Sequence, residues 1–215
     1  MNTRWLVHCD DCHVPRTQFC VVVHVMIDAF DRFKEQVIQV MRADRVVLDR
    51  PDLTRSAVLL PIIDRGGEPH LILTRRTMTV AAHKGQVALP GGAAEPEDRD
   101  IAETALREAM EEIGLEPNLV EVVGLLDDSV TTTGYIITPV VGFASGEAEL
   151  VPDSAEVAEV FEASFSTLLN PANHMMQVLE HKGVSFKDHR YFVGDYVIWG
   201  ATGRIISGFL SLLRR

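Results

Sequence analysis

Three glutamates stand close together in one short segment of the chain. Glu108, Glu111 and Glu112 occupy positions i, i+3 and i+4, which lie on one face of a helix with Cβ atoms about 5–6 Å apart. Like charges this close repel one another, and a hard divalent cation, which prefers carboxylate oxygens, would offset the repulsion. The spacing therefore predicts a metal-binding helix face, for which the alternative is an ordinary solvated acidic surface.

The apolar residues around these glutamates predict the helix itself. They recur at helical spacing and form a stripe on the opposite, core-facing side: Ala102, Ala105, Leu106, Ala109, Met110 and Ile113. Gly114 follows at a position where helices commonly end in a residue of positive φ. We expect a helix over residues 100–113 that packs through this stripe.

Two adjacent glycines stand upstream, in the segment Leu89-Pro90-Gly91-Gly92, and Arg107 follows Gly92 by fifteen positions. Glycine lets a backbone come close to a ligand or metal. Gly91 and Gly92 are therefore candidate substrate contacts, and the Gly92 carbonyl is a candidate metal ligand. An ordinary turn is the alternative for Pro-Gly-Gly alone, but its combination with the acidic segment favours a functional site.

These segments resemble the signature of the Nudix hydrolases, G-x5-E-x7-R-E-U-x-E-E-x-G-U, in which U is a bulky apolar residue. Residues 107–115 match its second half, with the small Ala109 at the first U. Gly92 and Arg107 are one residue farther apart than in the general pattern, and Asp98 stands at the acidic position. This expansion with Asp is a feature of one branch of the family, the coenzyme A diphosphatases.

The resemblance implies an α/β fold, a three-layer α/β/α sandwich with a mixed β-sheet, and a metal-dependent hydrolase. Mg²⁺ or Mn²⁺ would be held by Glu108, Glu111 and Glu112, with Gly92 as a weaker ligand. Arg107 would orient a ligating glutamate, and its guanidinium would lower the cost of keeping the carboxylates ionised.

The general base is left open between two residues. Glu108 would act through a metal-bound water, whereas Glu156, in the acidic stretch 153–159, would reach in from a loop. A plain solvated acid is the alternative for Glu156.

A second stretch resembles the same branch. Residues 72–92 are similar to its signature L-L-T-x-R-S-x-x-M-R-x-H-x-G-x-V-x-F-P-G-G, agreeing at Arg76 and His83 and lacking a basic residue at Ala81. The other departures are Thr77, Val80 and Leu89. Arg76, His83 and Lys84 are the substrate-binding candidates, because a guanidinium binds phosphate oxygens in pairs. A structural or merely exposed role is the alternative for His83.

The expected reaction is hydrolysis of coenzyme A or an acyl-CoA to 3′,5′-ADP and (acyl-)4′-phosphopantetheine. Another nucleoside diphosphate derivative, such as ADP-ribose or NADH, is the alternative substrate. A non-catalytic nucleotide-binding regulatory module is an alternative of another class, and missing glutamates would be its sign. The expected partner is thus a small molecule.

Bulk properties narrow the class of protein. The chain has 215 residues, 47% of them hydrophobic, and a net charge of −11, which argues against a nucleic-acid surface. No apolar run approaches the roughly 20 residues that span a bilayer, so no membrane segment is expected. The oligomeric state is left open, with a homodimer as one candidate.

All three cysteines, Cys9, Cys12 and Cys20, fall in the first 20 residues. None remains for disulfides in the body of the protein, which favours a reducing compartment, the cytoplasm. Together with His24 their spacing is loosely compatible with a zinc site. The alternative interpretation is that this N-terminal stretch is unstructured. We expect residues 1–25 to be an N-terminal extension and residues 26–215 a single domain.

Periodicity predicts the remaining elements. Helices are expected at 27–42, 163–169 and 201–213, and strands at 57–63, 70–74, 120–126, 135–143, 158–161, 190–193 and 196–198. Trp199 follows an apolar run and is expected to pack in the core, with stacking on a base as the alternative.

Overall fold

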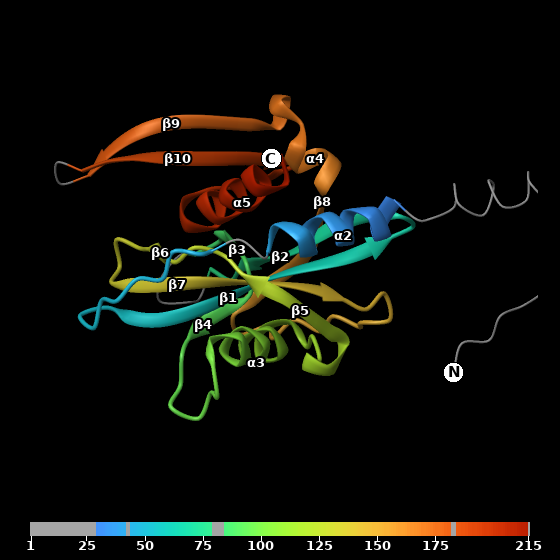
Figure 1. Cartoon of the computed structure of the whole chain (residues 1–215), viewed down its shortest axis with the longest axis horizontal. Coiled ribbons are helices and arrows are strands. Elements are labelled where there is room, and N and C mark those ends of the chain that lie inside the picture. The colour runs from blue at the N-terminus through green and yellow to red at the C-terminus, as the bar shows by residue number, and fades with distance from the viewer. Residues whose placement is uncertain (1–28, 42–43, 79–83, 182–183, 215) are drawn as a thin grey trace, which may run out of the picture.

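The computed structural model describes residues 29–41, 44–78, 84–181 and 184–214, and a mixed eight-stranded sheet forms the centre of this part of the chain (Figure 1). The strands are β1 (Thr54–Arg65), β2 (Glu68–Arg76), β3 (Val87–Ala88), β4 (Gly91–Ala93), β5 (Val120–Leu125), β6 (Ser129–Val130), β7 (Tyr135–Ala144) and β8 (Val157–Ser164). The extension 1–25, with its three cysteines, and the substrate candidate His83 lie outside the described residues.

The sheet runs in the order β3-β2-β1-β7-β5, and β4, β6 and β8 pair with β1, β7 and β2. The central strands β1 and β7 are parallel, whereas the other pairs are antiparallel. A parallel pair is usually covered on both faces and therefore reads as a continuous apolar run. Residues 57–63 of β1 are such a run and include four leucine or isoleucine side chains without exposed surface: Leu59, Leu60, Ile62 and Ile63.

Helices cover the two faces of the sheet (Figure 1). Helix α3 (Ile101–Ile113) packs on one face over side chains that include Ala57, Leu59 and Ile72. Helices α2 (Ala29–Val40) and α5 (Gly200–Leu213) cover the other face, where Leu60, Ile62, Leu71, Leu73 and Phe143 belong to the core. Successive residues of β1 thus enter different cores, because side chains alternate across a strand. The predicted α/β/α layers and mixed sheet are confirmed.

A second sheet covers the outer side of α5 (Figure 1). It consists of β9 (His174–His181), β10 (Val184–Val193) and β11 (Tyr196–Ile198), in the order β11-β10-β9. Strand β9 was not predicted and β10 is longer than the predicted strand at 190–193, because the polar and apolar residues of both strands do not alternate cleanly. Short α4 (Phe165–Leu169) and 3₁₀ turns at Pro117–Leu119 and Pro171–Asn173 complete the described elements.

The start of α5 is fixed to β10 rather than capped locally. Its N-cap residue, Trp199, makes no side-chain capping bond. The buried carboxylate of Asp188 instead accepts hydrogen bonds from the Gly200 N–H, from Arg190 Nε at 2.9 Å and from Gln177 Nε2 at 3.3 Å. A negative charge at a helix N-terminus is stabilising. Trp199 itself is 43% exposed, so the prediction that it packs in the core was wrong.

Most other predicted elements are confirmed with small shifts at their ends. The exception is residues 163–164, which belong to β8 and not to the following helix. Among the described helices, none combines the length and apolar character needed to cross a membrane.

Two glycines of α5 offer a matched test of its packing. A Cβ at Gly203 would overlap the carbonyl oxygen of His189, whereas a Cβ at Gly208 would meet nothing within 4 Å. We expect Gly203→Ala to lower the free energy of unfolding by about 1–3 kcal/mol, the usual cost of overpacking. Gly208→Ala should raise it by about 0.5–1 kcal/mol through helix propensity. Urea unfolding of both variants measures the difference, and equal effects would contradict the described packing.

Candidate active site

Helix α3 is held in place at both of its ends. The Asp100 side chain accepts hydrogen bonds from the Ala102 and Glu103 N–H groups, both at 2.9 Å, and so caps the N-terminus. Gly114 ends the helix in the left-handed conformation, with φ of 67°. These ends fix which helix face meets the sheet, and Ala105 and Ala109 are fully buried there.

The glycine pair brings the backbone of β4 against this helix. Gly91 and Gly92 pair with Val58 and Ala57 of β1, so β4 continues the central sheet beside α3. A Cβ at Gly92 would overlap the carboxylate of Glu108, and a Cβ at Gly91 would overlap the backbone of β1. Close approach to the backbone therefore requires glycine at position 91, whereas a side chain at position 92 would displace the Glu108 carboxylate. The predicted meeting of the Gly-Gly segment with the glutamates is present in the structure.

Glu112 is the buried carboxylate of the site. The residue is only 6% exposed. Its Oε1 accepts from Arg76 Nη1 at 3.4 Å, and its Oε2 accepts from the Gly91 N–H at 3.3 Å. Burial raises the pKa of Glu112 to about 7, although Arg76 and the Gly91 N–H oppose this shift. Two long hydrogen bonds leave acceptor capacity on both oxygens.

Glu108 and Glu111 differ in their surroundings. Glu108 is half-buried, and this burial raises its pKa, while Arg107 opposes the shift. The Glu111 side chain is 60% exposed and pairs with Arg107 at 3.3 Å. Thus Glu108 and Glu112 face the Gly91–Gly92 strand, and Glu111 lies at the solvent edge.

Arg107 connects most of the acidic groups. Its guanidinium binds Asp98 through Nε at 3.0 Å and Nη2 at 3.2 Å, and Glu108 through Nη1 at 3.0 Å. Nη2 also donates to the Ala93 carbonyl at 3.0 Å. Glu95 lies 3.9 Å from Nη1. One planar group with five donors can serve all of these acceptors, which a lysine ammonium could not do in the same geometry.

Asp98 anchors this arginine. Its side chain is 5% exposed and also accepts from Thr104 Oγ1 at 2.8 Å and from the Glu95 N–H at 3.0 Å. The Arg107 guanidinium and these donors hold the pKa of Asp98 well below its usual range. The sequence placed Asp98 at the acidic position of the signature but did not identify this anchoring contact.

On the substrate side, the structure brings Arg76 and Glu156 to the glutamates. Arg76 Nη2 lies 3.6 Å from Glu156 Oε2, so this arginine bridges Glu112 and Glu156. Glu156 comes from the loop before β8 and is exposed, as predicted. Lys84 is exposed and forms no ion pair with a described residue. Arg75 pairs instead with Glu159 at 3.1 Å.

The donor atoms present suit a hard divalent cation. The buried Glu112 carboxylate keeps free acceptor capacity, and a side chain at Gly92 would displace the Glu108 carboxylate. The acceptors that meet here, the carboxylates of Glu108 and Glu112, offer oxygen, the ligand that Mg²⁺ and Mn²⁺ prefer. Within the described ranges, no three His, Cys, Asp or Glu side chains converge closely enough to hold a metal without rearrangement. Both Glu108 and Glu111 are paired with Arg107 in this arrangement.

Comparison with known proteins identifies related chains. The NUDIX domain family matches residues 53–180. An uncharacterized Nudix hydrolase named NudL from Photorhabdus laumondii is 40% identical over 151 residues, which are 70% of this chain and 80% of that protein. The Pectobacterium atrosepticum protein of the same description is 40% identical over 155 residues, 71% of this chain and 79% of that protein. A MutT/nudix family protein from Enterococcus faecalis has a similar fold, with a TM-score of 0.51 at 16% identity, over 94% of this chain and 71% of that chain.

The Asp98–Arg107 contact predicts a pH-dependent stability. Because the pKa of Asp98 is lower in the folded than in the unfolded protein, its contribution is present above the unfolded pKa of about 4 and is lost as the pH falls towards the folded pKa. We expect Asp98→Asn to lower the free energy of unfolding by about 2 kcal/mol at pH 7, and by less at pH 3. Asp52→Asn, at an exposed ion pair with Arg50, is the control and should change little at either pH. An Asp98→Asn effect that is independent of pH would contradict this assignment.

Proposed function

This chain belongs to the Nudix hydrolase family, and we propose that it cleaves the diphosphate linkage of coenzyme A or an acyl-CoA to 3′,5′-ADP and (acyl-)4′-phosphopantetheine. One observation carries the catalytic part of the proposal. The buried Glu112 carboxylate stands beside the Gly91 N–H and the Arg76 guanidinium, with burial holding its pKa near 7. Strongly shifted carboxylates of this kind cluster at functional sites.

The proposed ligands of Mg²⁺ or Mn²⁺ are Glu108, Glu111 and Glu112, joined by the Gly92 carbonyl. Such an ion, when bound, polarises the phosphoryl oxygens and lowers the pKa of bound water. Arg107 positions Glu108 through its 3.0 Å contact and is itself oriented by Asp98. We therefore assign Arg107 a positioning role.

Arg76 is the proposed phosphate contact. Its guanidinium lies beside the carboxylates and is positioned to exchange the exposed Glu156 for a phosphate oxygen, which an arginine binds in paired hydrogen bonds. Lys84 and His83 remain proposed substrate contacts. The Gly91 and Gly92 backbone lines the site because no side chain intervenes.

The chemistry is attack of water on one phosphorus, with cleavage of the bond to the bridging oxygen. The water proton passes to a carboxylate acting as general base. Glu108 and Glu156 both remain proposed for this role. The raised pKa of Glu108, caused first by its burial, makes its carboxylate a stronger base than an exposed one, whereas Glu156 has the freedom of an exposed side chain.

The substrate assignment rests on the sequence similarity of residues 72–92 to the coenzyme A diphosphatase branch. Arg76 belongs to the matching positions, and the structure places it against Glu112. Ala81 lacks the basic residue of that branch, which favours ADP-ribose or NADH as the second candidate. A non-catalytic regulatory module would be expected to have lost the glutamates, and all three are present. The cytoplasm stays the proposed location, on the position of the cysteines.

Glu112→Gln tests the metal assignment. Because an amide keeps the shape but offers a weaker, neutral ligand, we expect turnover to fall at least about 100-fold, the loss typical when an essential electrostatic group is removed. Glu116→Gln is the control: it removes the same charge from an exposed residue just after the helix, and it should retain activity. Thermal unfolding checks that both variants fold. A Glu112→Gln enzyme that keeps most of its activity in excess Mg²⁺ would overturn the assignment.

A substrate panel tests the reaction. Coenzyme A, acetyl-CoA, ADP-ribose and NADH are each incubated with the enzyme and Mg²⁺, with and without EDTA, and the products are separated by chromatography. We expect 3′,5′-ADP and 4′-phosphopantetheine from coenzyme A, and none in EDTA, because metal ligation by carboxylates is required. Efficient cleavage of ADP-ribose with coenzyme A untouched would reject the proposed substrate.

A further inference from the structure

Strand β10 and helix α5 lie on the side of the central sheet away from α3 (Figure 1), and residues of both line a cleft. Its volume is about 470 Å³. The residues that line it are Lys187, His189, Arg204, Ser207, Gly208 and Ser211. We call this the basic cleft, because its three ionisable side chains are all basic.

The cations of the basic cleft lack a directly bound acidic partner among the described residues. Arg204 is partly buried and donates a hydrogen bond to the Val130 carbonyl at 3.3 Å, and the negative charge of Asp188 partly offsets its positive charge. Neither Arg204 nor Lys187 forms an ion pair there. The neighbouring carboxylate, Asp188, is engaged by Arg190 at 2.9 Å. The chain has 31 acidic residues and 20 lysines and arginines, so a cleft lined by cations without ion pairs is unusual. A partly buried charge without an ion-pair partner is also energetically costly.

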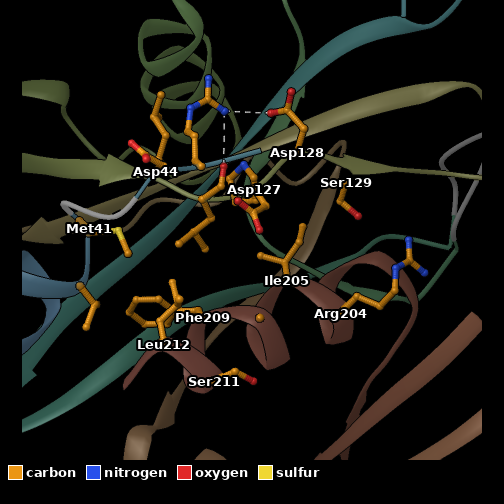
Figure 2. A pocket seen from close by; sticks show the side chains of 16 residues that line it. Met41, Asp44, Asp127, Asp128, Ser129, Arg204, Ile205, Phe209, Ser211 and Leu212 are labelled. Carbon is orange, nitrogen blue, oxygen red and sulfur yellow. Dashed lines mark hydrogen bonds and ion pairs between the residues drawn. The ribbon is translucent and has the colours of Figure 1, made fainter. Parts of the chain in front are cut away.

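A second pocket of about 410 Å³ adjoins the basic cleft and shares Arg204 with it (Figure 2). Its polar side carries Asp127 and Asp128, which do not form ion pairs with Arg204. Asp128 binds Arg45 at 3.1 Å, and Asp127 accepts from the Val46 N–H at 2.7 Å. Asp44 also lines this pocket, and among the described residues none of the three carboxylates forms an ion pair with Arg204.

His189 is the third ionisable side chain of the basic cleft, and it has a hydrogen-bond partner, His174. Its Nδ1 lies 3.0 Å from His174 Nε2. When His174 donates in this bond, the neutral His189 ring carries its proton on Nε2, which is then a donor for a further acceptor. Burial lowers the pKa of His189. His174 and the positive charges of Lys187 and Arg204 add to that shift, and the negative charge of Asp188 opposes it. The imidazole therefore senses the positive field of the cleft.

We propose that the basic cleft binds a phosphate group of a small solute, held by Lys187, His189 and Arg204. Phosphate matches the donors because an arginine and a lysine both make charge-assisted hydrogen bonds to its oxygens. Gly208 keeps the cleft open, since its Cβ position is free of neighbours within 4 Å. The site lies on a different face of the sheet from the glutamates and does not depend on the proposed reaction.

Nuclear magnetic resonance of the histidine rings in the full-length protein tests this site with inorganic phosphate as the probe. Phosphate should raise the pKa of His189 by about one unit, as an opposite charge at short range does, relative to chloride at the same ionic strength. The readout is local to the cleft, so phosphate bound near the glutamates does not imitate it.

Matched variants separate this cleft from general charge effects. Lys187→Gln removes an exposed cation and should weaken the phosphate effect about tenfold, as loss of one charge-assisted hydrogen bond does, and Arg204→Gln should do the same. Arg99→Gln removes an equal charge in the loop before α3 and should change nothing. A His189 pKa that is equal in phosphate and chloride would overturn the proposal, as would unchanged phosphate binding by the folded Lys187→Gln protein.

A lipid headgroup presents the same chemistry from another source. Vesicles of phosphatidylcholine with phosphatidic acid are therefore sedimented with the protein in a parallel experiment. Binding to these vesicles without any response to free phosphate would reject the small-solute ligand. A response to free phosphate that Lys187→Gln weakens supports it.

Discussion

Carboxylates gathered beside a glycine-lined strand set the main constraint on this structure. Glu108 and Glu112 are brought there by the packing of α3, and their burial raises both pKa values. The protein opposes this cost with Arg107 on one side and Arg76 on the other. Neither arginine saturates Glu112, whose remaining oxygen capacity is what a hard cation would use. The buried carboxylates that would make the site active therefore also lower the stability of the folded protein.

Rigid support for these groups comes from several independent contacts. Asp98 fixes Arg107 from the loop before α3, while Asp100 and Gly114 define the ends of the helix. On the sheet side, Gly91 allows a close backbone contact with β1 that a side chain would prevent, and Gly92 leaves room for the Glu108 carboxylate. Catalytic groups need such support because small displacements weaken positioning and electrostatic stabilisation.

Charge is distributed unevenly over the two faces of the central sheet. The glutamates belong to α3, which packs on one face of the sheet. The basic cleft lies on the side of the other face, between α5 and β10. The β9–β10 hairpin is responsible for this second feature, since it supplies Lys187 and His189. The buried Asp188 joins the same strand to the start of α5. Attachment of this hairpin thus shapes a surface that the central sandwich by itself does not have.

Local residue spacing was sufficient to predict the α3 helix, its glutamate face and the role of the glycine pair, because these depend on short-range geometry and steric limits. It also indicated the buried run of β1 and the layered architecture. Long-range packing was needed to show that Glu112 is buried while Glu111 is exposed, that Asp98 anchors Arg107, and that Arg76 rather than Arg75 reaches the glutamates. It likewise decided the pairing of β9 with β10 and the exposure of Trp199. These outcomes depend on which segments distant in the chain come together, and local periodicity does not encode that information.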